Sequence, residues 1–404
     1  MASDNNTKDQ SLFTDSGRHL NIRRFGWLRR QLPAGWSITK FLLLTTCAVY
    51  FILFIQRSNH FLQHTGYPVQ VAADRGTCCL PPDHSQDICG RTNCTSPCPQ
   101  PKPLVFNERP TESNVDHNQN AFFIETSGSG LLTMRQACAV ESLAFHNPNL
   151  TVNVLFVDVP INKSVFVLQQ LKEKYNNIRL VSINLNEYLA GTVLEHWYHC
   201  TDWKIGSFQV NNLSNGLRLL TLQKYGGYYF DLDIISVRPV TFYHNFVAVQ
   251  DATSLNNDVI HADLKNPFIE TAIQDFVLNF KQVFSNYSTI WGHNGPILIT
   301  RALRKWCNVT DIESMDYVPC RGFNVLPTTS FHPVHYGQMK TLFVQPWANE
   351  TGARLAWLTD RVIGVHIWNK LSKNQPIYKN STQDYIRLAR THCPSVFSAA
   401  PDVF

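Results

Sequence analysis

Asp231 and Asp233 end the aromatic run Tyr225-Gly-Gly-Tyr-Tyr-Phe-Asp-Leu-Asp233 and carry the clearest chemistry in this 404-residue chain. Side chains two residues apart in an extended strand point to the same side, roughly 6.5–7 Å apart. Two carboxylates placed in this way can share one hard divalent cation, which can in turn hold a diphosphate. An Asp-x-Asp pair is common by chance, but an apolar strand after a Gly-Gly break favours a metal–nucleotide site.

The segments before the two aspartates alternate between patterns typical of strands and of helices. We expect strands at 121–124, 152–157 and 178–183, and helices at 133–146, 164–175 and 213–225. This alternation predicts an α/β domain with a largely parallel sheet. Ligands of such sheets bind at the carboxyl ends of the strands, where Asp231 and Asp233 fall.

The N-terminal part of the chain predicts a membrane anchor. Residues 1–40 hold seven Lys or Arg against three Asp, which accounts for four of the five net positive charges. The apolar residues 41–55 follow, and we interpret them as a transmembrane signal anchor, with a cleaved signal peptide as the alternative. Residues 1–40 would then be a cytosolic tail and the remainder lumenal. Little basic charge remains beyond the tail, which argues against a nucleic-acid partner.

Residues 56–118 are rich in proline and cysteine and are predicted to form a stem, followed by a catalytic domain at 119–396. Ten of the 11 cysteines and eight Asn-x-Ser/Thr acceptors lie past the anchor, as expected of a lumenal protein. The stem cysteines favour disulfides over a zinc site because no histidine has ligand spacing. The acceptors are Asn93, Asn149, Asn162, Asn212, Asn286, Asn308, Asn349 and Asn380.

Five cysteines lie in the stem and five in the catalytic domain, so full pairing needs a bridge between these segments or between chains. The second case would allow a homodimer through stem cysteines. Cys307 and Cys320 flank a polar loop of 12 residues and are predicted to pair with each other.

An ordered set of motifs resembles the animal alpha-1,4-glycosyltransferases over residues 120–395. The motifs are Phe122-Phe-Ile-Glu-Thr-Ser127, Ser214-Asn-Gly-Leu-Arg218, Gly226-Gly-Tyr-Tyr-Phe-Asp-Leu-Asp233, Trp291-Gly-His-Asn-Gly-Pro296, Trp306-Cys307, Cys320-Arg-Gly322 and Gly364-Val-His-Ile-Trp-Asn-Lys370. The resemblance implies a GT-A-type fold, a manganese-dependent retaining transferase that uses a UDP-sugar, and a type II protein of the Golgi membrane.

The resemblance also implies roles for single residues. Asp233 would bind the metal directly, Asp231 would serve the ribose or the metal through water, and His366 would complete the coordination. Trp368 and Lys370 would lie towards the diphosphate, where Lys370 could neutralise the leaving group's charge; an ordinary surface lysine is the alternative.

The remaining predicted site residues would contact the donor nucleotide-sugar. They are Ser214, Asn215, Arg218 and Gly227, with Glu125 near the nucleotide and His293 as a catalytic residue that faces the donor sugar or the acceptor. Members of this family commonly have aspartate where this chain has Asn215, so that contact would lose a charge. A fold-stabilising carboxylate is the alternative for Glu125, and a helix-entry turn for the segment of His293.

The resemblance implies transfer of galactose from UDP-galactose, in alpha-1,4 linkage, to a glycosphingolipid such as lactosylceramide. Transfer of N-acetylgalactosamine or N-acetylglucosamine is the alternative. Retention can proceed by same-face displacement or through a covalent intermediate, for which Gln250, Asp251 and Asp258 are candidate nucleophiles. A glycoside hydrolase needs two carboxylates that face each other across the bond, which a pair on one strand does not provide. A non-catalytic lumenal module would have no need of Asp231, Asp233 and His366.

Overall fold

The computed structural model describes residues 117–162, 165–205, 208–281, 292–312, 319–345 and 355–404. The predicted tail (1–40), anchor (41–55) and nearly all of the stem lie outside these ranges. Within them, no helix combines the length and the apolar character needed to cross a bilayer.

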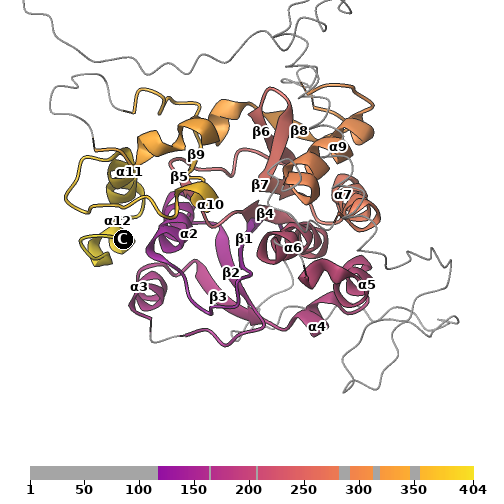
Figure 1. Ribbon diagram of the computed structural model, residues 1–404, viewed down its shortest axis with the longest axis horizontal. Coiled ribbons are helices and arrows are strands. Elements are labelled where there is room, and N and C mark those ends of the chain that lie inside the picture. Colours follow the sequence, from indigo (N-terminus) through magenta and orange to yellow (C-terminus); the bar gives the residue numbers. More distant parts are fainter. Residues whose placement is uncertain (1–116, 163–164, 206–207, 282–291, 313–318, 346–354) are drawn as a thin grey trace, which may run out of the picture. The chain divides into compact units, whose positions relative to one another are not determined.

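A mixed sheet of seven strands forms the centre of the described region (Figure 1). Its order is β3 (Ile178–Ile183), β2 (Thr151–Val157), β1 (Asn120–Glu125), β4 (Gly227–Phe230), β7 (Ser254–Ala262), β6 (Phe246–Asp251) and β8 (Asn324–Leu326). Strands β1 to β4 run parallel to one another, while β7 is antiparallel to both of its neighbours. The α/β prediction is confirmed, and the antiparallel β7 was not anticipated.

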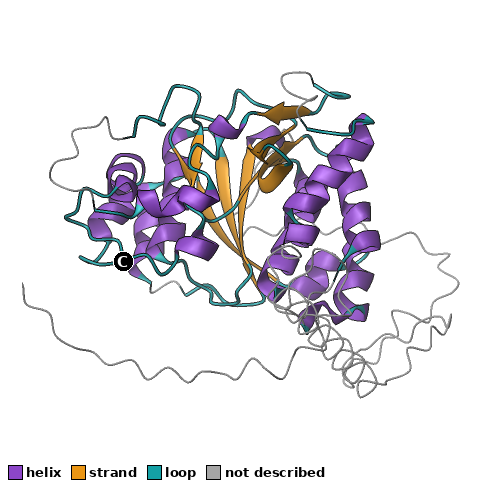
Figure 2. Ribbon diagram, turned by 45° about the horizontal axis from the view of Figure 1, so that its top comes forward, coloured by secondary structure: helices purple, strands orange, loops and turns teal. Residues whose placement is uncertain are grey.

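Helices cover both faces of the sheet, so the domain has three layers (Figure 2). One face is packed by α2 (Met134–His146), α3 (Phe166–Lys174), α11 (Asp384–His392) and α12 (Pro394–Ala399). The other is packed by α4 (Leu185–Leu189), α5 (Val193–Cys200), α6 (Gln209–Tyr225), α7 (Pro267–Asn279) and α9 (Pro296–Cys307). Alternate residues of β1 supply the two cores, Phe123 to the first and Phe122 to the second. Apolar residues on both strand faces thus exclude water on both sides.

The two aspartates do not lie on a strand, which corrects the geometry expected from the sequence. Strand β4 ends at Phe230, and the chain turns so that the Ile234 N–H donates to the Asp231 carbonyl oxygen (3.2 Å). Strand β5 (Ile234–Ser236) then leaves the main sheet and pairs antiparallel with β9 (Gly364–His366). The turn therefore connects the seven-stranded sheet to a separate two-stranded ribbon.

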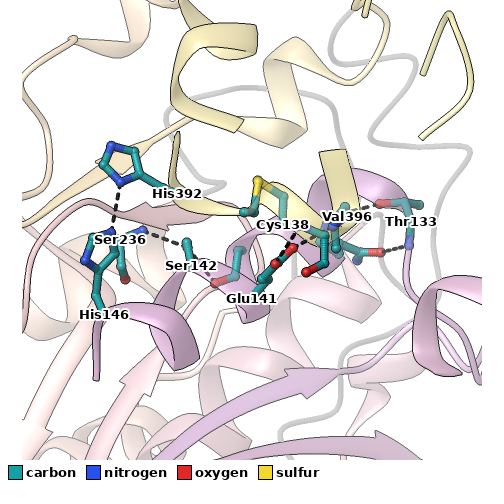
Figure 3. The surroundings of a disulfide bond; sticks show 12 residues. Thr133, Cys138, Glu141, Ser142, His146, Ser236, His392 and Val396 are labelled. Atoms are coloured by element: carbon teal, nitrogen blue, oxygen red, sulfur yellow. Dashed lines mark hydrogen bonds between the residues drawn. A yellow bond between two sulfur atoms is a disulfide. The ribbon is translucent and has the colours of Figure 1, made fainter. Parts of the chain in front are cut away.

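Two disulfides join described cysteines. Cys307–Cys320 is confirmed, and Cys138–Cys393 ties α2 to the junction of α11 and α12 (Figure 3). Cys200 is also disulfide-bonded. Its partner lies outside the described residues because the other four described cysteines pair with one another.

The described glycosylation acceptors fall into two groups. Asn149, Asn162, Asn308 and Asn380 are exposed. Asn212 is only 4% exposed, and its Oδ1 accepts a hydrogen bond from Asn294 Nδ2 (3.1 Å). The folded chain therefore does not present Asn212 to a glycosylating enzyme, which corrects one of the eight predicted acceptors.

Candidate active site

Asp233 and His366 meet because the β5–β9 ribbon is paired in one register. Ile234 lies opposite His366, and the Ile367 N–H donates to the Asp233 carbonyl oxygen (3.0 Å). The side chains follow: His366 Nε2 lies 3.1 Å from Asp233 Oδ2, which also accepts from the Asn369 backbone N–H (2.7 Å). Two residues 133 positions apart in the sequence thus form one polar contact.

Gly364 allows the ribbon to pack closely against the core. A Cβ at this position would lie 2.9 Å from Phe331 Cδ1 and 3.0 Å from Ile234 Cγ2. Contacts this short are repulsive, so only glycine fits without moving the ribbon.

Asp231 is held by two groups from the other side of the site. Its Oδ1 accepts from Tyr229 Oη (2.6 Å) and lies 3.1 Å from Arg218 Nη2. Arg218 is buried on α6, where it also donates to the Asn257 carbonyl oxygen (2.6 Å) and to Ser214 Oγ (2.9 Å). Asp231 Oδ2 accepts no hydrogen bond from a described residue, so this oxygen can face a ligand.

Asp258, a residue of β7, lies behind the Asp233–His366 contact. It is fully buried, and its Oδ2 lies 2.7 Å from His332 Nε2 and 3.0 Å from His366 Nδ1. The second contact is an ion pair whose angle falls short of a hydrogen bond. His332 Nδ1 hydrogen-bonds the Val249 carbonyl oxygen (2.8 Å), which fixes its ring.

His332 was not predicted as a site residue, and Asp258 was predicted only as a candidate nucleophile. A side chain with no exposed surface does not reach a donor sugar, which leaves Gln250 and Asp251 as the accessible candidates. Asp258 comes one residue before Val259, the partner of Phe230 in the β4–β7 ladder. Asp258 could have been identified from the sequence only by predicting that β7 pairs with β4, which places Asp258 beside the end of β4.

The predicted donor residues on α6 lie together. Asn215 Oδ1 accepts from Asn257 Nδ2 (3.0 Å), and a Cβ at Gly295 would come within 3.1–3.3 Å of this pair of side chains. Gly295 thus lets the turn before α9 approach the amides closely. Ser214 contacts both Arg218 and Tyr229, so Ser214, Asn215 and Arg218 form one polar wall beside Asp231.

Trp368 and Lys370 follow His366 in the chain but have different surroundings. Trp368 has a left-handed backbone (φ 53°), donates from Nε1 to the Val334 carbonyl oxygen (2.8 Å), and stacks on His366 with ring centroids 4.0 Å apart. Lys370 is exposed, and its Nζ lies 5.8 Å from the Phe208 ring centroid at the start of α6. Trp368 therefore packs the histidine, whereas Lys370 is the cation that faces solvent.

The other predicted residues make contacts away from the aspartates. His293 Nε2 hydrogen-bonds the Asn279 carbonyl oxygen (3.1 Å), at the end of α7. Glu125 accepts from the backbone N–H groups of Ser127 (2.8 Å) and Ser129 (3.3 Å) and closes the turn after β1. Gly227 begins β4, at the opposite end of that strand from Asp231.

Charge in the site is distributed unequally. Burial raises the pKa of Asp231 to about 6, a rise that Arg218 opposes and that Asp233 and Asp258 increase. Burial alone would lower the pKa of His366, but the carboxylates of Asp233 and Asp258 outweigh it and raise that pKa to about 10. The pKa of Asp258 is well below its ordinary value because His332 and His366 outweigh the cost of burial. The histidine next to Asp233 is therefore cationic at neutral pH.

The donor set fits a divalent cation. Asp231 and Asp233 offer carboxylate oxygens and His366 offers an imidazole nitrogen, a combination that suits Mn²⁺. The 3.1 Å between His366 Nε2 and Asp233 Oδ2 is also a spacing at which two atoms can bind the same ion. A cation there would replace the proton on Nε2, since both neutralise Asp233.

Two groups of described side chains have ligand atoms within 4.8 Å of one another. One is Asp258, His332 and His366, and the other, His244, His261 and Asp263, does not suit a metal. His261 Nδ1 accepts from the Asn245 N–H (2.8 Å), so its Nε2 must carry the proton and has no lone pair for a metal. A cavity of about 710 Å³ includes His244 and Phe246 in its lining, at the edge where β6 begins. Both features lie at the sheet edge opposite Asp231.

Two family models match the chain, and each matched range contains residues of this site. "Glycosyltransferase sugar-binding region containing DXD motif" matches residues 133–254, which include Asp231 and Asp233. "Alpha 1,4-glycosyltransferase conserved region" matches residues 261–400, which include His366. Over these two ranges the chain matches the alpha-1,4-glycosyltransferases. The site therefore draws residues from both matched ranges.

Relatives in this family differ in the sugar that their names specify. Lactosylceramide 4-alpha-galactosyltransferase of Rattus norvegicus is 29% identical over 306 residues, which cover 75% of this chain and 79% of the relative. Alpha-1,4-N-acetylglucosaminyltransferase of Homo sapiens is 26% identical over 294 residues, with 71% and 82% covered. The family thus gives a hexosyltransferase with alpha-1,4 specificity and leaves the sugar open.

Solved glycosyltransferases are also similar in part. The PaToxG glycosyltransferase has a TM-score of 0.34 at 19% identity and covers 46% of this chain and 69% of its own. The galactosyltransferase LgtC, in complex with donor and acceptor sugar analogs, has a TM-score of 0.30 at 12% identity, with 52% and 74% covered.

Proposed function

We propose that this chain is a retaining, manganese-dependent transferase of GT-A type that moves galactose from UDP-galactose to a glycosphingolipid such as lactosylceramide. The observation that carries this proposal is the contact between His366 and Asp233. Asp231, two residues earlier in the chain, pairs through its carboxylate with the buried Arg218. This arrangement offers ligands for one cation and a polar wall for the nucleotide-sugar. Lactosylceramide 4-alpha-galactosyltransferase of Rattus norvegicus also aligns with 75% of the chain.

The contacts of each residue suggest its role in metal binding, nucleotide binding or stabilisation of the leaving group. Asp233 and His366 would hold Mn²⁺ directly, and Asp231, whose Oδ1 is engaged by Arg218 and Tyr229, would use Oδ2 for the ribose or for a metal-bound water. A bound Mn²⁺ would supply Lewis-acid stabilisation of the departing diphosphate. Lys370, exposed beside the start of α6, would add a positive charge on the same leaving group.

The same-face route of retention fits the buried position of Asp258. With this carboxylate inaccessible, the leaving phosphate oxygen would accept the proton of the acceptor hydroxyl as the sugar bond breaks. Gln250 and Asp251 remain alternatives for a nucleophile. Gln250 accepts from Asn256 Nδ2 (3.0 Å) and donates to Asp251 Oδ2 (2.9 Å), so its side chain is held in place.

A donor panel tests the proposal. The purified full chain is incubated with lactosylceramide, Mn²⁺ and one of three donors: UDP-galactose, UDP-N-acetylglucosamine or UDP-N-acetylgalactosamine. We expect a product with terminal alpha-1,4-linked galactose, and no product in the presence of EDTA. Transfer of an N-acetylhexosamine instead would replace the donor assignment, and full activity in EDTA would refute the metal.

The same proposal includes a type II Golgi protein with a lumenal catalytic domain. Protease treatment of intact microsomes should leave the catalytic domain protected and remove only the tail. Removal of N-glycans should lower the apparent mass, since Asn149, Asn162, Asn308 and Asn380 are exposed. Digestion of the catalytic domain in intact microsomes would refute the orientation.

A further inference from the structure

We propose that Asp258 is a positioning residue for the metal site, with His332 as its anchor. The inference rests on the proposed function, because it concerns the metal that Asp233 and His366 would hold. Asp258 lies 3.0 Å from Nδ1 of His366, on the side of the ring opposite Asp233. A carboxylate there keeps the proton on Nδ1, which leaves the Nε2 lone pair for a cation.

His332 explains how a buried carboxylate can be held in that position. Asp258 and His332 are both almost completely buried, and an isolated charge in such a place would be costly. The 2.7 Å contact between His332 Nε2 and Asp258 Oδ2 compensates the charge. The hydrogen bond from His332 Nδ1 to the Val249 carbonyl oxygen then fixes the pair to β6.

The chain of contacts crosses four segments of the fold. It runs from Val249 on β6 through His332, which follows β8, to Asp258 on β7 and His366 on β9. Trp368 stacks on His366 at 4.0 Å and closes the remaining side of its ring. The ring orientation is therefore set by residues that themselves do not face the substrate.

The two carboxylate oxygens of Asp258 have different surroundings, which makes asparagine a suitable test substitution. Oδ1 is buried and has no hydrogen-bond partner among the described residues, so the side-chain polar contacts of Asp258 go through Oδ2. A change to asparagine keeps the shape but removes the charge that both histidines share. The orienting contact to His366 is thereby weakened without creating a cavity.

The test measures Mn²⁺ binding directly, by electron paramagnetic resonance of the full chain with saturating UDP. We expect Asp258→Asn to weaken Mn²⁺ binding about 10- to 100-fold, as loss of a group that orients a metal ligand does. Glu141→Gln is the matched control. It neutralises another fully buried carboxylate, which binds Tyr175 and the start of α12, and should lower the melting temperature with unchanged Mn²⁺ affinity.

Unchanged Mn²⁺ affinity in a folded Asp258→Asn protein would overturn the inference and leave the proposed function standing. Failure of the wild-type chain to bind Mn²⁺ would instead overturn the proposed metal, and this inference with it. If Asp258→Asn does not fold, His332→Gln tests the inference instead, since it retains the carboxylates of Asp233 and Asp258. We expect that variant to bind Mn²⁺ several-fold more weakly than wild type, and equal binding would refute the anchor.

Discussion

Asp231 and Asp233 have different partners although only one residue separates them. Asp231 belongs to the α6 side through Arg218 and Tyr229, and Asp233 belongs to the β5–β9 ribbon through His366 and Asn369. The turn between the carboxylates makes this division possible, since it joins the main sheet to the ribbon. A metal bound to Asp233 would therefore lie at the junction of two substructures.

Asn215→Asp tests whether the polar wall of Ser214, Asn215 and Arg218 contacts the donor. Asp would still accept from Asn257 Nδ2, so folding should be preserved. If this position faces the donor, the restored charge should strengthen one hydrogen bond by about 1–2 kcal/mol and lower the donor KM roughly ten-fold. Kinetics with the three UDP-sugars measure this. Identical KM values and preferences in wild type and variant would remove Asn215 from the donor site.

At the scale of elements, the site depends on the ribbon. Gly364→Ala would push β9 away from Phe331 and Ile234 and move His366 relative to Asp233. We expect a loss of about 1–3 kcal/mol in the free energy of unfolding and weaker Mn²⁺ binding, as overpacked cores show. Gly292→Ala is the control for thermal unfolding, because its Cβ would meet Ile297 at an ordinary 3.6 Å. Equal melting temperatures of Gly364→Ala and wild type would contradict the packing argument.

The interface of α2 and α11 predicts a pH dependence of stability. His146 Nε2 and His392 Nδ1 lie 2.9 Å apart (Figure 3). Burial, His146 and Arg238 lower the pKa of His392 from 6.5 to about 4, and burial and Arg238 also lower the pKa of His146. Below pH 6.5 the unfolded chain takes up protons that the folded chain does not, so stability is lost as pH falls.

We expect the free energy of unfolding to drop by about 1–2 kcal/mol between pH 7.5 and pH 5 through His392. Chemical denaturation at a series of pH values measures the drop, and His392→Asn should reduce the slope. A slope that the variant leaves unchanged would show that His392 is not the responsible group.

The elements before Asp231 could largely be predicted, while the ribbon could not. Apolar strand patterns and the capping residue Thr133 are local signals, and β1, β2, β3, α2 and α6 were found within a few residues. The pairing of Ile234 with His366 joins segments 132 positions apart, and three-residue strands carry no period to detect. His332 was missed for the same reason: its partner Asp258 is adjacent only in the fold.

At the scale of the whole molecule, the C-terminal helices are fastened to α2. Cys138–Cys393 closes a separation of 255 residues, and Glu141 accepts from the Ser395 and Val396 N–H groups (2.8 and 2.7 Å) at the start of α12 (Figure 3). The chain end is thereby held against the first helix of the domain. The ribbon is also held to α2, because the Ser236 N–H of β5 donates to Ser142 Oγ (2.9 Å).

Replacing both Cys138 and Cys393 by serine should therefore lower the free energy of unfolding more than replacing both Cys307 and Cys320, which close a shorter loop. Loop-closure entropy predicts losses of about 5 kcal/mol for Cys138–Cys393 and about 3 kcal/mol for Cys307–Cys320. Thermal and denaturant unfolding of the two double variants gives the comparison. A larger loss for Cys307→Ser/Cys320→Ser would contradict the entropic order.

Asp233→Ala tests whether Asp231, Asp233 and His366 form a metal–diphosphate site. The measurement is the Mn²⁺-dependent rate of UDP release from UDP-galactose with lactosylceramide, in wild type and in folded variant. We predict a rate at least about 10³-fold lower in the variant, because several kcal/mol of leaving-group stabilisation are lost with the metal. A folded Asp233→Ala protein with a rate near that of wild type would contradict the account.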